Sequence, residues 1–109
     1  MASLAVLIVL YQPDSDQIAQ SLQAIAEGES AYAVEVCLWD NDVGPPGTGQ
    51  LAHVLETWQR NGLSIHSFGR IGNLGFGRAI NALLKQVTQP FVLLLNQDAI
   101  PEQGTLQRV

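Results

Sequence analysis

The stretch Leu4–Leu10 reads LAVLIVL and contains only apolar side chains. Such a run predicts a strand that is buried on both faces, as strands of parallel sheets are. It is too short to cross a bilayer, which takes about 20 apolar residues in a helix. The stretch Phe91–Leu95, with the sequence FVLLL, has the same character further along the chain. We therefore expect both stretches to be strands of one sheet.

Strand-like and helix-like patterns alternate between these two stretches. Apolar residues alternate with other residues over 33–38, and residues 63–68 form a further short strand pattern. Asp14 or Ser15 can cap the first of three intervening helices. The apolar residues at helical spacing are Ile18, Leu22 and Ile25, then Leu51, Val54, Leu55 and Trp58, and then Phe76, Ile80, Leu83, Leu84 and Val87.

This order predicts an α/β fold. We expect a three-layer sandwich in which helices cover both faces of a mostly parallel, four-stranded sheet. The 109 residues, of which 47% are hydrophobic, suffice for one domain with one core. We therefore predict a single domain over residues 1–109.

Charge and cysteine content limit the class of binding partner and the cellular compartment. The net charge of −5 argues against a nucleic-acid partner. Cys37 is the only cysteine, so an internal disulfide is excluded and a reducing compartment is favoured. Neither a basic segment nor a small-residue cleavage site follows Met1, as a signal peptide would require. We expect a cytoplasmic location.

Polar residues gather where the predicted strands end. The four segments are residues 11–13, 40–42, 69–78 and 96–98. In open α/β sheets, ligands bind beyond the carboxyl ends of the strands. The contrast between apolar strands and polar strand ends therefore predicts a ligand site at this edge of the sheet.

Two of these segments carry carboxylates. Asn96 and Asp98 are two residues apart in an extended segment and face the same way, which suits a hard cation such as Mg²⁺ or Mn²⁺. The alternative is a polar strand end in which Asp98 caps a helix near Pro101. A carboxylate in the segment 40–42 can bind ribose hydroxyls or a base N–H, and the alternative there is an Asx turn.

The glycine-rich segment 69–78, GRIGNLGFGR, opens the third predicted helix. Its backbone amides can hold phosphate, and Arg70 and Arg78 add positive charge. It matches neither the dinucleotide-binding fingerprint nor the P-loop. The alternative is a tight turn with close packing of helix on sheet.

Together these segments resemble the family 2 glycosyltransferases. Residues 7–11 (LIVLY) are similar to the first strand of that family, and residues 38–42 (LWDND) to its Val-Asp-Asn-x-Ser segment. Residues 73–81 (NLGFGRAIN) resemble its Asn-x-Gly-x-x-x-Ala-x-Asn helix start, and residues 94–101 (LLNQDAIP) its Leu-Asn-x-Asp metal motif. The closest similarity is to the rhamnosyltransferase-like branch.

The resemblance implies the Rossmann-like N-terminal half of a GT-A fold that binds a nucleoside-diphosphate sugar with Mg²⁺ or Mn²⁺. It implies a UDP- or dTDP-linked donor and a saccharide or lipid-linked acceptor in surface polysaccharide synthesis, at the inner face of the membrane. The residues it assigns to the nucleotide sugar are Tyr11, Pro13, Asp40, Asn41, Gly75, Arg78, Asn81 and Asn96, and Asp98 is assigned to the metal.

The sequence departs from the family pattern in two places. Asn96 stands at the first acidic position of the metal motif, which reduces the expected metal affinity. The family's catalytic base is expected downstream of Val109, so no catalytic residue is assigned, and we expect this chain alone to bind the donor weakly and to transfer poorly or not at all.

Two other classes of protein are alternatives to a glycosyltransferase. A non-catalytic nucleotide-sugar-binding module would use the same pocket. A nucleotidyltransferase or flavodoxin-like domain would need a phosphate-binding loop after its first strand, where this chain has residues 11–14, YQPD. Finally, Phe91–Leu95 is expected to form an exposed apolar sheet edge, which predicts a homodimer or a higher assembly.

Overall fold

A computed structural model describes residues 2–27, 32–42 and 50–97. Strands and helices alternate in the predicted order. The elements are β1 (Ala2–Leu10), α1 (Ser15–Glu27), β2 (Tyr32–Asp40), α2 (Gln50–Arg60), β3 (Ser64–Gly69), α3 (Phe76–Leu84) and β4 (Phe91–Asn96). Asp14 is the residue that caps α1, because its Oδ1 accepts the backbone N–H of Asp16 at 2.9 Å.

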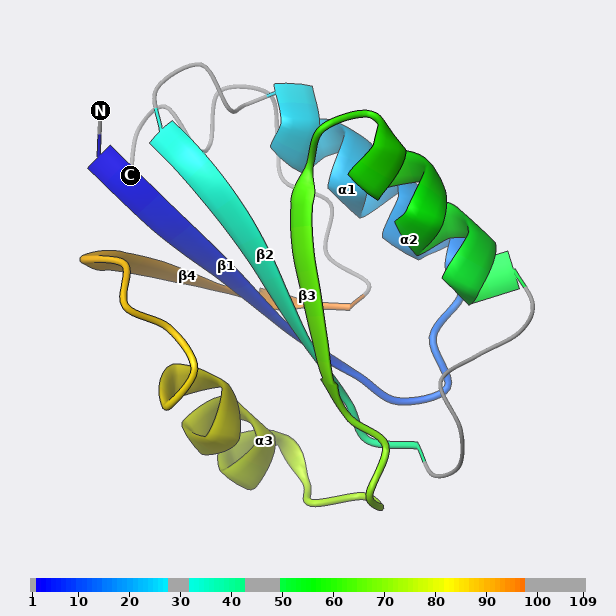
Figure 1. The fold of residues 1–109 in the computed structure, drawn as a ribbon. Coiled ribbons are helices and arrows are strands. Elements are labelled where there is room, and N and C mark those ends of the chain that lie inside the picture. The colour runs from blue at the N-terminus through cyan, green and yellow to red at the C-terminus, as the bar shows by residue number, and fades with distance from the viewer. Residues whose placement is uncertain (1, 28–31, 43–49, 98–109) are drawn as a thin grey trace.

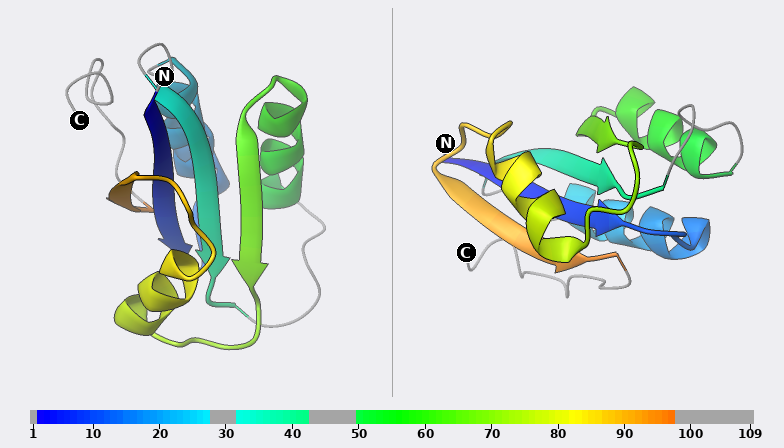
Figure 2. Two further views of the ribbon diagram at one scale, coloured as in Figure 1. Left: turned by 60° about the vertical axis from the view of Figure 1, so that its left-hand side comes forward. Right: turned by 90° about the horizontal axis from the view of Figure 1, so that it is seen from below.

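The four strands form one parallel sheet in the order β3-β2-β1-β4. Helices α1 and α2 cover one face and α3 covers the other (Figures 1 and 2). The predicted α/β sandwich is therefore confirmed. From β1 the chain adds β2 and β3 on one side and then crosses to place β4 on the other side. The topological switch point, where ligands bind in such sheets, thus lies between β1 and β4.

The apolar run of β1 serves two cores. Its even-numbered residues, with those of β2, pack against α1 and α2, and its odd-numbered residues pack against α3. Strand side chains alternate between faces, so a strand that is covered on both sides favours apolar residues at every position. The prediction that Leu4–Leu10 is buried on both faces is confirmed, except that Val9 is only partly buried.

The third helix differs from its prediction. It ends at Leu84, so Val87 packs against the core from the segment that follows the helix. Phe76 and Leu84, expected on the buried face, are 52% and 44% exposed. The physical reason is that α3 packs over β1 and β2 and leaves β4 uncovered, so only Ala79, Ile80 and Leu83 are buried.

Strand β4 lies at the edge of the sheet that the described residues form, as expected of Phe91–Leu95. Leu93 and Leu95 pack against the core of α1 and α2. On the opposite face Val92 and Leu94 are exposed, because α3 does not reach them.

Among the described residues, no helix is long and apolar enough to cross a membrane.

Cys37 is buried in the core beneath α3, as expected of a small apolar residue in a strand. Burial raises the pKa of its thiol above the usual value, and the negative charge of Glu35 raises the pKa further. The thiol therefore stays protonated at neutral pH.

Candidate functional site

The carboxyl ends of the four strands meet at one edge of the sheet (Figure 1). A pocket of about 390 Å³ opens there, at the switch point between β1 and β4 and next to the first residues of α3. It is lined by Val9, Tyr11, Asn41, Asn73, Gly75, Phe76, Asn96 and Gln97. The position of this pocket is the one that parallel-sheet topology predicts for a ligand site.

The structure brings four of the predicted nucleotide-sugar residues together. Tyr11, Asn41, Gly75 and Asn96 come from four segments of the chain and line the same pocket. Four others are not among its lining residues: Pro13 lies half-buried between β1 and α1, Asp40 ends β2, and Arg78 and Asn81 are exposed on α3. The predicted metal ligand, Asp98, lies outside the described residues.

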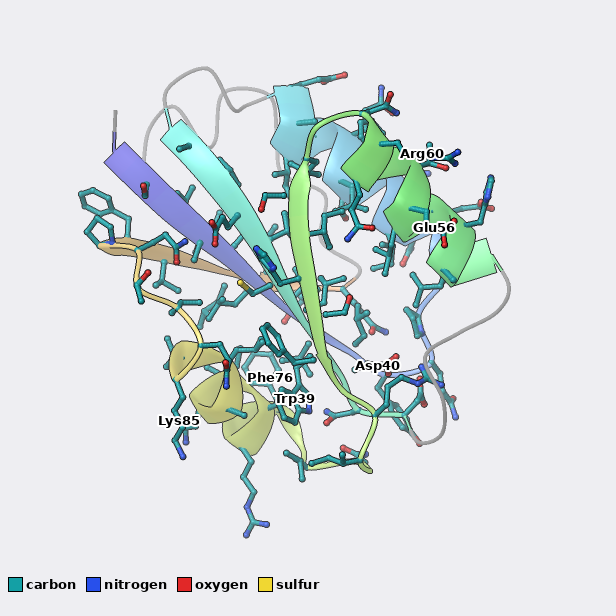
Figure 3. All side chains as sticks on the ribbon, viewed as in Figure 1. Trp39, Asp40, Glu56, Arg60, Phe76 and Lys85 are labelled. Carbon is teal, nitrogen blue, oxygen red and sulfur yellow. The ribbon has the colours of Figure 1, made fainter. Side chains whose placement is uncertain are left out.

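Asp40 precedes the pocket residue Asn41 and is only 8% exposed. Both oxygens of its carboxylate accept hydrogen bonds. Its Oδ2 accepts a hydrogen bond from the guanidinium of Arg70. Its Oδ1 accepts the backbone N–H of Asp42 at 2.9 Å, which is the Asx turn that the sequence left open. The carboxylate of Asp40 is therefore held in one orientation at the end of β2 (Figure 3).

The last pair of the ladder between β2 and β3, Asp40 with Gly69, brings the two backbones close together and places Arg70. The backbone N–H of Arg70 donates to the carbonyl oxygen of Asp40 at 2.7 Å. At Gly69, with φ of 99°, a Cβ would lie 2.5 Å from that same carbonyl oxygen. Arg70 itself has a φ of 63°, which is unusual for a residue with a side chain. Glycine at position 69 thus permits the approach that pairs Arg70 with Asp40.

Asn41 ties the glycine-rich loop to the sheet. It is only 4% exposed, and its backbone N–H donates to the carbonyl of Leu10 at 2.7 Å. Its Oδ1 accepts the backbone N–H of Leu74 at 3.2 Å. Asn73 accepts the N–H of Gly75 at 2.8 Å in a second Asx turn. These contacts fix the loop at the position where α3 begins.

The first turn of α3 faces the pocket through Gly75 and Phe76. Gly75 is the N-cap, and no side chain caps the helix. The first N–H groups of a helix have no partner within the helix, and together with the helix dipole they favour an anion. The tight turn of the alternative interpretation is present, because Asn73 forms an Asx turn with Gly75. Phosphate binding by the loop stays a prediction.

Of the two oxygen-bearing residues of the metal motif, Asn96 and Asp98, only Asn96 lies within the described residues. Asn96 pairs in register with Val9, the last backbone pair between β1 and β4, and its exposed side chain offers one amide oxygen at the pocket. Within the described ranges, no group of three or more His, Cys, Asp and Glu residues comes together. The role of Asp98 therefore stays a prediction.

Sequence reasoning did not assign several residues that shape this site. The sequence shows Arg70 only as a charge beside the glycines, and Gln97 only as the residue between Asn96 and Asp98. Asn73 and Phe76 line the pocket without having been assigned to it. A signal existed for Asn73, since Asn two residues before glycine favours an Asx turn. The contacts of Arg70 and Gln97 are long-range and carry no local signal.

The comparison with protein families decides the assignment. The model of the family described as glycosyl transferase family 2 matches residues 5–109. This chain belongs to glycosyl transferase family 2. The resemblance drawn from four short motifs is thereby confirmed, and the chain is a family 2 glycosyltransferase domain.

Solved structures share the fold of this family 2 domain. The mannosyltransferase PcManGT from Pyrobaculum calidifontis, in complex with GDP-Man and Mn²⁺, has a TM-score of 0.75 at 21% identity, over 94% of this chain and 30% of its own. TarS from S. aureus has a TM-score of 0.76 at 26% identity, over 97% of this chain and 18% of its own. A shorter TarS structure, 1-349, gives 0.74 at 25% identity, over 97% of this chain and 30% of its own.

These similarities confirm the GT-A arrangement of sheet and helices. The family 2 chain spans 30% or less of the length of these solved structures. No curated protein matches the chain significantly.

Proposed function

We propose that this family 2 domain binds a nucleoside-diphosphate sugar together with Mg²⁺ or Mn²⁺, and that the whole enzyme transfers the sugar to an acceptor hydroxyl. The observation that carries the proposal is the pocket at the switch point, lined by Tyr11, Asn41, Gly75 and Asn96. The complex of the mannosyltransferase with GDP-Man and Mn²⁺ supports the same class of ligand.

Each part of the pocket suits one part of such a donor. The half-exposed side chain of Tyr11 lines the pocket and offers an apolar surface for a base, and Asn41 offers an amide for the nucleoside. Pro13, which is half-buried, and Asp40, whose carboxylate is engaged by Arg70, are assigned to this end of the donor by the family resemblance alone. The open N-terminus of α3 suits the diphosphate. Arg78 and Asn81, further along α3, are assigned to the same end of the donor by the family resemblance alone.

A divalent cation, when bound, would neutralise charge on the diphosphate leaving group. The amide oxygen of Asn96, which lines the pocket, is one suitable ligand for such an ion, because hard cations prefer oxygen ligands. We propose Asp98 as the charged ligand beside it. With an amide in place of the first carboxylate, we expect the diphosphate to contribute much of the metal affinity.

We propose that the catalytic base comes from outside residues 1–109. Inverting transfer requires a group that deprotonates the acceptor hydroxyl as it attacks the anomeric carbon. None of the residues that line the described pocket is an Asp, Glu or His. Residues 1–109 would then form one donor-binding domain. The same observation favours, as a second candidate, a module that binds a nucleotide sugar without catalysis.

The wider setting is proposed from the motif resemblance. We propose a rhamnosyltransferase-like parent enzyme in surface polysaccharide synthesis, with a saccharide or lipid-linked acceptor. It would act in the cytoplasm, at the inner face of the membrane. The single cysteine is consistent with that compartment.

Calorimetric titration tests the donor site. We expect the chain to bind at least one of UDP, dTDP and GDP more tightly with Mn²⁺ than without it. Removing a charged metal ligand should weaken the metal-dependent binding by roughly tenfold or more, so we expect Asp98→Ala to do so. Glu56→Ala, on the exposed surface of α2, is the matched control and should bind as the unaltered chain does. A nucleotide affinity that changes neither on addition of Mn²⁺ nor in Asp98→Ala would contradict the metal assignment.

We also propose that β4 pairs with β4 of a second copy of this chain. The strand is uncharged, lies at the sheet edge and exposes Val92 and Leu94 on one face. Sedimentation velocity over a range of concentrations should show a dimer or larger species. We expect Leu94→Lys to shift the chain toward monomer, and Leu84→Lys on α3 to leave the assembly in place. A monomer at every concentration would contradict this pairing.

A further inference from the structure

One side chain joins the ends of β1 and β4 at the pocket. The Oε1 of Gln97 accepts the backbone N–H of Tyr11 at 2.8 Å, and its Nε2 donates to the carbonyl oxygen of Tyr11 at 3.0 Å. The last backbone pair between the two strands is Val9 with Asn96. The side-chain amide of Gln97 therefore continues the parallel ladder just beyond its last backbone pair.

This amide pair, which we term the Gln97 clamp, satisfies both backbone polar groups of Tyr11. Unpaired backbone groups are costly unless water or a side chain replaces the missing partner. The next residue is held from the other side, because the N–H of Gln12 donates to Oδ2 of Asp42 at 3.2 Å. Gln12 has a φ of 45°, a conformation that persists only where surrounding contacts hold it. The segment Tyr11–Gln12 is thus fixed between the ends of β4 and β2.

The residues joined by the clamp belong to the pocket wall. Tyr11 and Gln97 both line the pocket, as does Asn96 beside Gln97. The side chain of Tyr11 is about half exposed, so the protein core does not fix its ring, and its backbone decides where the ring begins. The clamp also holds the segment that carries Asn96 at a set distance from Tyr11.

We propose that Gln97 is a positioning residue of the donor site. Its amide fixes the backbone of Tyr11, which we assign to the base, relative to Asn96, which we assign to the metal and diphosphate end. The two halves of the donor then meet a wall that is already in place, and binding does not have to order it. This inference rests on the proposed nucleotide-sugar site.

Gln97→Met tests the clamp, because methionine keeps the length of the side chain and removes both hydrogen bonds. Without these two hydrogen bonds the backbone of Tyr11 is no longer held in place, so binding of the preferred nucleoside diphosphate with Mn²⁺ should weaken by about tenfold. Amide hydrogen exchange at Tyr11, followed by NMR without nucleotide, should become about tenfold faster. Gln97→Asn, which keeps an amide but is too short to make both bonds, should show the same two changes if Gln97→Met does not fold.

Gln89→Met is the matched control. Gln89 precedes the opposite end of β4, where its Nε2 donates to Oε2 of Glu35 at 2.6 Å. Gln89→Met should lower the melting temperature by about as much as Gln97→Met does, since each variant loses side-chain hydrogen bonds. Nucleotide affinity and Tyr11 exchange should stay at the level of the unaltered chain, which a general loss of stability would not allow.

The outcomes separate the two proposals. If the unaltered chain binds no nucleoside diphosphate, the proposed function is overturned, and Tyr11 exchange still shows whether the clamp exists. If the unaltered chain binds and Gln97→Met binds equally well, the positioning role is overturned while the donor site stands. Equal losses of affinity in Gln97→Met and Gln89→Met would also overturn the positioning role.

Discussion

Replacing Gly69 by alanine is expected to lower the free energy of unfolding by about 3 kcal/mol. The added Cβ would lie 2.5 Å from the carbonyl oxygen of Asp40, 3.0 Å from its nitrogen and 3.1 Å from Cε2 of Trp39. Two of these contacts are with backbone, which cannot rotate away. The φ of 99° adds a conformational cost that glycine does not incur.

Gly62→Ala separates the two causes. Gly62 has a φ of 98°, nearly that of Gly69, but a Cβ there would meet nothing within 4 Å. It should lose only the conformational part, about 1 kcal/mol. Urea unfolding of both variants measures the difference. Equal losses would contradict the prediction that the close approach of Gly69 to Asp40 adds to the cost of the substitution.

Arg70→Met is expected to lower the free energy of unfolding by about 2 kcal/mol. The variant leaves the carboxylate of Asp40, whose side chain is only 11% exposed, without its charged partner. Breaking a buried pair on one side costs more than the pair contributes, because the remaining charge is poorly solvated. The estimate is below that for a fully buried pair, since 26% of the Arg70 side chain reaches solvent. Methionine preserves the apolar part of the Arg70 side chain, and its backbone has to adopt the same positive φ, so the comparison isolates the lost charge.

His66→Gln provides the comparison, because it removes the contact between Nε2 of His66 and Oε2 of Glu35 at 3.7 Å, in which both side chains are nearly half exposed. Such a pair contributes little, so the free energy of unfolding should change by less than about 0.5 kcal/mol. Urea unfolding of the two variants, together with nucleotide titration, checks both effects. We expect Arg70→Met to weaken nucleotide binding and His66→Gln not to. A change in Arg70→Met as small as that in His66→Gln would contradict the structural importance of the Asp40 pair.

The fold was predictable because its signals are local. Continuous apolar runs such as Leu4–Leu10 identify strands covered on both faces, and helical spacing identifies the elements between them. The prediction for α3 was wrong in detail because Phe76 and Leu84 look like core residues in sequence. Whether they are buried depends on which strands the helix covers, and α3 covers β1 and β2 but not β4.

The edge of the sheet that carries the site was also predictable, since parallel strands present their carboxyl ends together. The choice among the polar residues at that edge was not. Asp40 and Asn41 are neighbours with similar side chains, yet Asn41 lines the pocket while Asp40 is engaged by Arg70 and by an Asx turn. Strand alternation directs the two side chains to different faces, and contacts across the sheet decide what each can bind.

The sequence by itself determined the order of elements, the parallel sheet, the family and the side of the sheet where ligands bind, because each of these follows from local patterns or short motifs. The tertiary structure alone decided that Gly69 must lie against Asp40, that Arg70 pairs with that carboxylate, and that Gln97 holds Tyr11 across the switch point. Those contacts join residues that lie 29, 30 and 86 positions apart. Their geometry depends on how the strands align, and no local pattern records that alignment.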